Sequence, residues 1–356
     1  MKRIIKFVKS VLKKFVKFAL KHFSSWKTVR AKNKGSGYTY TGRDMPDYFS
    51  QVRQNYHELS NPFHYYQELV EALVRLDRFS IDPLVDLLST PADNQRLLGL
   101  RHDIDADPIT ALRAARHLAR YGVAGSFYLL HTAIYYGEFY NGVFVRNPLL
   151  LEWVRGFIVT GCEIGIHNDV LGADLNPGVD GSEAFKTELA WLRSLRANIR
   201  GTVGHNSLPI YGAENSEVFV GRKLWSRKEL SPKGNTLPLE SLSERLLNLQ
   251  YEGTFARPKT KINLLEVRAF ITEKEKASVR SEHWMKKYLL DNPYCDWETD
   301  YQFWLIGKNQ WVAAGRFDGQ TLFEFAIGID RLIYLLNNLP EGSRSVLNIH
   351  PAYIRG

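Results

Sequence analysis

The feature that most constrains the fold is an alternation of short apolar runs with helical patterns, which begins near residue 96. The apolar runs end in polar groups, and the stretches between them carry hydrophobic residues at helical spacing. This alternation is typical of parallel strands joined by crossover helices, because parallel neighbours need long connections. We therefore predict an α/β, barrel-like fold. The predicted strands span residues 96–102, 123–130, 162–167, 201–205 and 345–350, and the predicted helices span 109–121, 149–159, 182–199 and 322–339.

Two regions depart from this rhythm. Residues 35–96 are predicted to form a helical lead-in, with a helix whose N-cap is Asn61. Residues 206–320 are predicted to form an α+β insertion that contains a hairpin turning at 307–309. The rest of residues 97–356 would form the barrel-like domain, and the chain is long enough to bury a large core.

The positive charge of the chain is confined to its first 34 residues. The net charge is +9, but residues 1–34 hold ten Lys, two Arg and no acidic residue, which leaves 35 basic against 38 acidic groups elsewhere. A mildly acidic body is not typical of nucleic-acid-binding proteins, so we expect no nucleic-acid partner for it. Two cysteines cannot build a disulfide framework, which favours a reducing compartment.

Residues 1–34 have the pattern of a basic amphipathic helix. Apolar residues recur at steps of three and four from Ile4 to Phe18, and lysines recur on the opposite side. Lysines interrupt every apolar run after at most three residues, which argues against a secretory signal and against a membrane-spanning helix. We predict that the segment binds the surface of an anionic membrane. The alternatives are a helix packed on the body or on a partner, and a basic arm for nucleic acid.

Side chains that suit a metal ion follow the predicted strands. Four histidines fall at strand ends, and two aspartates follow the first of them: His102, Asp103, Asp105, His167, His205 and His350. The carboxyl ends of parallel strands converge on one face of an α/β barrel, so these groups could meet. Carboxylate and imidazole ligands suit a catalytic divalent ion, typically zinc but also iron, cobalt or nickel. Taken singly, a strand-end histidine is more often structural, an aspartate here could be a turn residue, and Asp107 is expected to be an N-cap.

Three motifs carry a resemblance to a known family. The segments "LRHDID", "EIGIHND" and "LNIHP" resemble those of the polysaccharide deacetylase superfamily, of the NodB-homology or carbohydrate esterase family 4 type. The resemblance is closest to its divergent "HDVD" branch of surface-polysaccharide biosynthesis, and it covers residues 97–206 and 320–352. It implies a distorted, incompletely closed barrel.

The resemblance also implies roles for individual residues. Asp103 resembles the catalytic base, Asp105 and His167 resemble metal ligands, and His350 resembles the histidine that protonates the leaving group. The family usually has a second histidine four residues after the first, but this chain has Leu171 there. His205 is the favoured replacement ligand.

Asp169 is the second choice for that ligand, and loss of the histidine could instead mean weak metal binding or none. The resulting interpretation is a metal-dependent hydrolase, with zinc as the favoured cofactor, that deacetylates an N-acetylated sugar in polysaccharide or lipopolysaccharide precursor biosynthesis. The absence of an export pattern points to the cytoplasmic face of the membrane and to a lipid-linked glycan precursor as substrate. The alternatives are a non-catalytic carbohydrate-binding or scaffold protein, and a hydrolase of another C–N bond.

Two further expectations complete this interpretation. The aromatic stretch "YYGEFY" (135–140) would suit sugar stacking, although such residues are more often core. A base beside a metal ligand acts on proton transfer, so Asp103→Asn is expected to cut turnover by about 10²–10⁴-fold while leaving metal content and stability unchanged.

Overall fold

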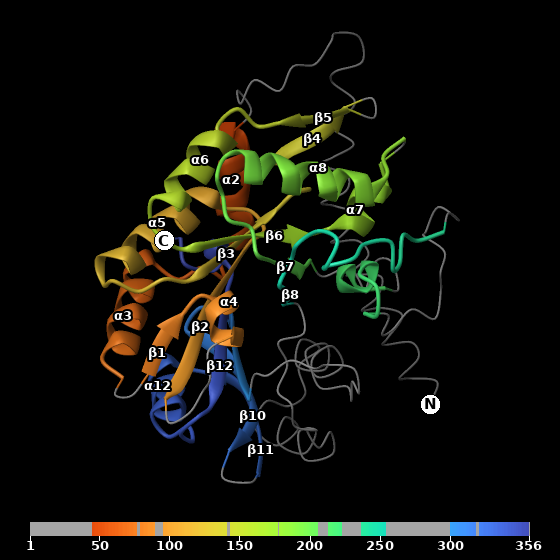
Figure 1. The fold of residues 1–356 in the computed structure, drawn as a ribbon. Helices are drawn as coiled ribbons and strands as arrows, with labels where there is room; N and C mark the ends of the chain where they lie inside the picture. Colours follow the sequence, from red (N-terminus) through yellow and green to blue (C-terminus); the bar gives the residue numbers. More distant parts are fainter. Residues whose placement is uncertain are drawn as a thin grey trace, which may run out of the picture.

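A single mostly parallel sheet forms the centre of the protein (Figure 1). The computed structural model describes residues 45–76, 79–89, 95–140, 143–176, 178–205, 213–222, 236–253, 300–317 and 320–355. The sheet order is β11 (Gln320–Ile327), β10 (Gln310–Phe317), β9 (Tyr301–Gly307), β12 (Arg344–Ile349), β2 (Arg96–Ile104), β3 (Ser126–Leu130), β6 (Glu163–Asn168), β7 (Gly201–Gly204) and β8 (Tyr251–Glu252), with β1 (Phe79–Asp82) beside β2.

All neighbouring strands are parallel except in the β9–β10–β11 meander at one end. The predicted α/β class with a parallel sheet is therefore confirmed. Closure into a barrel is not: the end strands β11 and β8 do not pair with each other within the described ranges. A separate small hairpin is formed by β4 (Gly137–Tyr140) and β5 (Val143–Arg146).

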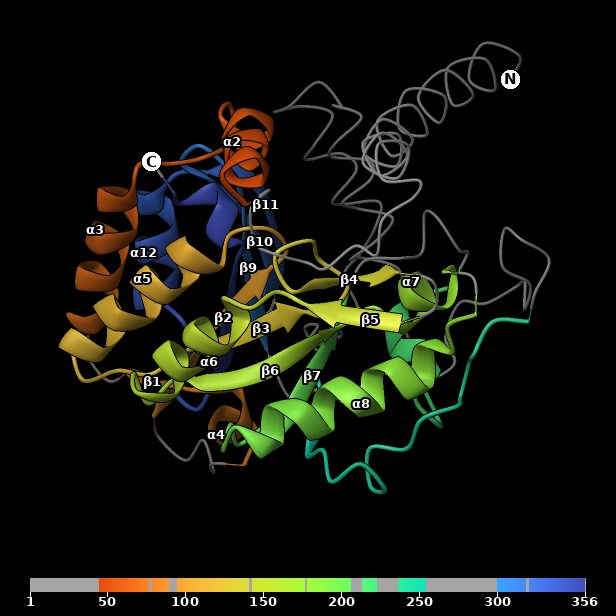
Figure 2. The same cartoon turned by 90° about the horizontal axis from the view of Figure 1, so that it is seen from above.

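Eight α-helices are present in the part of the chain that the structure describes. They are α2 (Met45–Tyr56), α3 (Phe63–Val74), α4 (Leu84–Ser89), α5 (Pro108–Arg120), α6 (Leu150–Ile158), α7 (Val170–Asp174), α8 (Gly181–Ser194) and α12 (Ile329–Asn337), with short 3₁₀ turns η1 (Asn215–Val218) and η2 (Pro351–Tyr353). Seen from above, α3, α5, α6 and α12 lie together along the outer side of the sheet (Figure 2). Their apolar faces bury against it, as in the fully buried Leu69 of α3 and Leu118 of α5.

The two predicted helix caps had different outcomes. Asp107 accepts a hydrogen bond from Thr110 N and so caps α5, with Pro108 at its first position, as predicted. Asn61 does not cap α3, because Pro62 occupies the N-cap position. The Asn61 amide instead donates to the carbonyls of Gly307 and Tyr353, and so it ties the start of α3 to elements far along the chain.

Three predictions about the C-terminal half need correction or refinement. The predicted hairpin is present as β9 and β10, but both strands lie in the central sheet, so residues 301–317 are not part of a separate insertion. The predicted helix over 322–339 is wrong in its first half, which forms β11; only α12 is helical. Within the lead-in over 35–96, β1 is likewise a sheet strand.

The aromatic stretch at 135–140 supplies core residues. Tyr135 and Tyr136 are fully buried. The Tyr135 hydroxyl donates to Ile104 O and accepts from Leu130 N, which joins the ends of two neighbouring strands. These two rings therefore have no exposed face for a sugar.

Every helix in the described ranges is too short or too polar to span a lipid bilayer. The predicted amphipathic helix over 1–34 lies outside the described residues, as does most of the predicted insertion, including residues 254–299.

Candidate metal centre

The candidate site lies at the carboxyl ends of neighbouring parallel strands. Asp103 is in the last part of β2 and Asp105 follows that strand, His167 is near the end of β6, and His205 and His350 directly follow β7 and β12. The strand registers bring these positions level, since Leu130 pairs with His167 and His167 with Val203. The parallel sheet thus gathers groups that are far apart in sequence at one edge.

Three of these side chains could share one metal ion. Asp105, His167 and His205 each offer a ligand atom, and these atoms all lie within 4.8 Å of one another. They are the three residues that the sequence suggested as ligands. One carboxylate and two imidazoles form a donor set suited to a divalent ion that keeps an open coordination position.

The tautomer of His167 favours a cation at this point. Its Nδ1 lies 2.9 Å from the Val203 carbonyl oxygen, so Nδ1 carries the hydrogen and donates it. In the neutral ring, Nε2 then presents a lone pair, and it faces Asp105 Oδ1 at 3.2 Å. Two acceptors at this distance repel each other unless a proton or a cation lies between them.

Asp105 is ionised and poorly satisfied by its surroundings. Burial would raise its pKa, but the charge of His350, and that of His167 when its ring is protonated, favours the carboxylate and lowers the pKa to about 2. Its Oδ1 atom is buried, and no hydrogen bond reaches it from the described residues. A buried anionic oxygen without a donor is costly, so the site fits a bound cation.

Asp169, the second choice as a ligand, lies next to His205. It caps α7 by accepting from Gly172 N, and it also accepts from the Thr132 hydroxyl and the Asn215 amide. Its Oδ1 lies 3.8 Å from His205 Nδ1. At this separation Asp169 acts on the imidazole through its charge rather than through a hydrogen bond, and this charge favours an imidazole whose Nδ1 carries a proton.

Asp103 is held by a buried ion pair. Arg101 Nε donates to Asp103 Oδ1 at 2.8 Å and Arg101 Nη2 donates to Oδ2 at 2.6 Å, and both residues are under 10% exposed. Asn348 adds a longer contact to Oδ2. Burial would raise the pKa of Asp103, but the Arg101 guanidinium outweighs it and holds that pKa well below its ordinary range. Asp103 is therefore a fixed anion.

His350 completes the cluster on the side of β12. Its Nε2 lies 3.5 Å from Asp105 Oδ2, and its Nδ1 is buried with no hydrogen-bond partner in the described ranges. Burial lowers its pKa below the ordinary value, against the opposing effect of Asp105 and Asp103.

Two histidines lie where the sequence did not place them. His102 points to the other side of β2, where it is fully buried, stacks on Phe127 and bonds to the Tyr66 hydroxyl. His131 directly follows β3, and its Nε2 accepts a hydrogen bond from Asp169 N. Sequence reasoning missed His131, although its position after a predicted strand was the same signal that singled out the others.

The position that the family resemblance leaves without a histidine lies in the core. Leu171 is fully buried in α7, and its amide donates to the Asn215 side chain. His205 instead comes from the next strand, held by a hydrogen bond from its own amide to Asn168 O.

Comparisons with protein-family models, with curated proteins and with solved structures find no match for this chain. Function is therefore inferred from the side chains at this edge of the sheet and from the motif resemblance.

Proposed function

We propose that this protein is a metal-dependent hydrolase that deacetylates an N-acetylated sugar in polysaccharide or lipopolysaccharide precursor biosynthesis. The observation that carries the proposal is the convergence of Asp105, His167 and His205, whose ligand atoms lie within 4.8 Å of one another. The motif resemblance supplies the substrate class, and the fold is then an incompletely closed, distorted barrel.

Asp105, His167 and His205 would hold the ion. The Val203 carbonyl would orient the His167 imidazole, and the charge of Asp169 would favour a proton on Nδ1 of His205. A divalent ion such as zinc supplies Lewis acidity to polarise the acyl carbonyl and to make water more acidic. The remaining chemistry belongs to the residues around it.

Asp103 is the proposed acceptor of the proton that water loses as it attacks the carbonyl carbon. Arg101 fixes the direction of the carboxylate through two hydrogen bonds, and the oxygen bonded to Arg101 Nε keeps a second lone pair for the water. The same pairing keeps Asp103 ionised, which a base requires, but it also lowers the basicity of the carboxylate. An ion held by Asp105, His167 and His205 would offset this loss by making the water more acidic.

His350 is the proposed donor to the leaving amine. Its ring lies beside Asp105, on the side of the site formed by β12, opposite the β6 and β7 histidines in the sheet order. The C–N bond of the amide breaks, acetate leaves with the oxygen of water, and the amine nitrogen takes a proton from the protonated form of the imidazole, which the charges of Asp105 and Asp103 favour.

The location of the protein follows from the same proposal. Residues 1–34 would bind the anionic inner face of the membrane and bring the site to a lipid-linked precursor in the cytoplasm. Nucleic acid is not a proposed partner.

Metal content and acetate release, measured together, test the proposal. Purified full-length protein loaded with zinc is assayed by elemental analysis and by acetate release from a panel of N-acetylated sugar nucleotides and lipid-linked N-acetyl sugars. Wild type should retain about one ion and release acetate. Asp105→Asn and His167→Gln should lose both, and Asp86→Asn, a half-exposed carboxylate on α4, should lose neither.

Two results would contradict the proposal. Equal metal content in wild type and Asp105→Asn would place the ion elsewhere. Full metal content in wild type without acetate release from any member of the panel would favour the non-catalytic carbohydrate-binding protein or hydrolysis of another C–N bond.

A further inference from the structure

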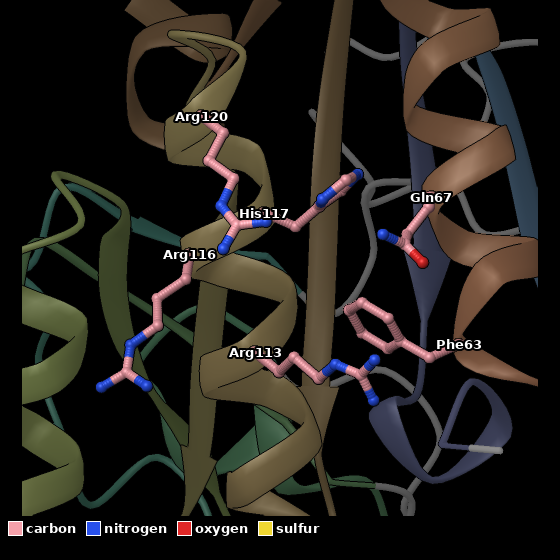
Figure 3. A pocket seen from close by; sticks show the side chains of 6 residues that line it. All are labelled: Phe63, Gln67, Arg113, Arg116, His117 and Arg120. Carbon is pink, nitrogen blue, oxygen red and sulfur yellow. The ribbon is translucent and has the colours of Figure 1, made fainter.

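A second candidate site lies between α3 and α5 and shares no residue with the metal centre. It is a pocket of about 310 Å³, lined by Phe63, Gln67, Arg113, Arg116, His117 and Arg120 (Figure 3). Its volume reaches the lower end of the range for small-molecule sites. Its lining is basic and aromatic and contains no acidic residue.

The basic residues form one stripe on α5. Arg113, Arg116 and Arg120 lie three and four positions apart, which places them on the same face of the helix. None of the three forms an ion pair within the part of the chain that the structure describes. The nearby carboxylate of Glu71 is already contacted by Arg75 and by the Tyr121 hydroxyl.

Such a stripe is unfavourable without a counter-charge. Like charges at these spacings repel each other along a helix and destabilise it. The helix dipole favours a cation in the last turn, where Arg120 lies, but this effect does not reach Arg113 in the first half of α5.

Arg113 is held in place by an aromatic ring. Its guanidinium carbon lies 3.7 Å from the centroid of the Phe63 ring (Figure 3). Stacking on a ring uses the face of the guanidinium and leaves the N–H groups at its edge available to an anion.

His117 provides an independent sign of a missing ligand. The residue is only 6% exposed, and its Nε2 atom is buried with no hydrogen-bond partner among the described residues. Burial lowers the pKa of His117, whereas the backbone of Gln67 lies close enough to the ring to favour its charged form. A buried ring nitrogen without a partner is costly, and here it lies in the wall of a pocket flanked by guanidinium groups.

We propose that this pocket binds the phosphate group of a phosphorylated ligand. Guanidinium groups present paired donors that match phosphate oxygens, and several of them together suit a multiply charged anion better than a single carboxylate. His117 Nε2 can accept a hydrogen bond from a protonated phosphate oxygen or donate one when the ring is protonated. The phosphate can belong to a soluble molecule or to a lipid headgroup.

Titration calorimetry with inorganic pyrophosphate tests the proposal on the full-length protein at low ionic strength. Wild type should bind pyrophosphate, and Arg113→Gln and Arg120→Gln should each weaken binding by about tenfold or more, as expected for loss of a charge-assisted hydrogen bond. Arg155→Gln, an exposed arginine on α6 outside the pocket, is the matched control and should bind like wild type. The His117 ring resonances of the wild type should shift on titration, a readout that needs no variant.

Three results would overturn the proposal. The first is that wild type does not bind pyrophosphate at millimolar concentration, and the second is that Arg155→Gln loses as much pyrophosphate binding as the pocket variants do. The third is that citrate binds as tightly as pyrophosphate, which would show a general anion site. Unchanged binding in the pocket variants would place the phosphate elsewhere, for example on the basic residues 1–34.

Vesicles distinguish the two sources of phosphate. Phosphatidylcholine vesicles with and without phosphatidate are compared for wild type, Arg113→Gln and Arg155→Gln. Weaker binding of Arg113→Gln than of Arg155→Gln to phosphatidate supports a lipid headgroup as the ligand. Equal vesicle binding, with pyrophosphate binding lost only in Arg113→Gln, supports a soluble phosphorylated molecule.

Discussion

Asp103→Asn is expected to destabilise the protein, contrary to the expectation from sequence that this change leaves stability intact. The surroundings of Asp103 give the reason for this revised prediction. Asp103 neutralises Arg101 at a position where both side chains are under 10% exposed, through hydrogen bonds of 2.8 and 2.6 Å. Asparagine has no charge, and its amide group would face a guanidinium that also only donates.

The magnitude follows from burial. Removing one partner of a buried ion pair leaves the other charge unpaired and costs about 3–5 kcal/mol. Asp86→Asn is the matched control, since Asp86 pairs with Arg200 at 3.4 Å with both side chains 31–46% exposed, and such a pair contributes about 1 kcal/mol at most. Arg101→Met/Asp103→Leu should lose less stability than Asp103→Asn, because no charge is left unpaired.

Chemical denaturation at pH 7, followed by circular dichroism, measures these differences. The pKa of Asp103 is depressed in the folded state, so the pair contributes fully above the unfolded value of about 4 and is lost only as the pH falls through the lower folded value. A free energy of unfolding for Asp103→Asn within about 1 kcal/mol of the Asp86→Asn control would refute the reasoning. Turnover of Asp103→Asn has to be measured at a temperature where the variant is still folded.

Three other perturbations have defined outcomes. Burial lowers the pKa of His102 to about 4. The free energy of unfolding should therefore fall by up to about 3 kcal/mol as the pH falls from about 6.5 to 4. In the double variant Tyr66→Phe/His102→Phe, denaturation curves should lack this part of the pH dependence. Asp169→Ala removes the N-cap of α7 and should lower the free energy of unfolding by roughly 0.5–2 kcal/mol. It should also weaken metal binding by about 10–100-fold, measured by competition with a chelator. Asp107→Ala removes the N-cap of α5 and should affect stability alone. Deletion of residues 1–34 should abolish salt-sensitive binding to anionic vesicles in a co-sedimentation assay, and binding that persists would refute the interfacial helix.

Much of the fold could be predicted because its determinants are local. Hydrophobic periodicity and the Asp107–Pro108 start placed α5 between β2 and β3, since cap and period lie within one segment. The segment that forms β11 is predicted to be helical because a short apolar run has no distinctive period, and it forms a strand because it pairs with β10. The contacts of Asn61 could not be predicted either, because its partners Gly307 and Tyr353 are more than 240 positions away in the sequence.

Sequence reasoning could predict which residues form the candidate site, but not the role of each residue in it. Strand ends at one edge of a parallel sheet suffice to bring Asp105, His167 and His205 together. They do not indicate that the Asp169 oxygens accept hydrogen bonds from three donors, or that the Leu171 side chain is buried in the core. Those outcomes depend on packing around α7 and η1, which no local pattern encodes.

The "LRHDID" segment nevertheless explains, once the strand is known, why its two aspartates have different surroundings. Alternation along β2 sends Arg101 and Asp103 to one face and His102 to the other, where it stacks on Phe127. Arg101 thereby neutralises the first carboxylate and fixes it as a buried anion. Asp105, one step further in the same series and just beyond the strand, has no arginine and faces the imidazoles of His167 and His350 instead. Two aspartates two positions apart are thus separated into a fixed anion and a candidate ligand by one upstream arginine and by the point at which the strand ends.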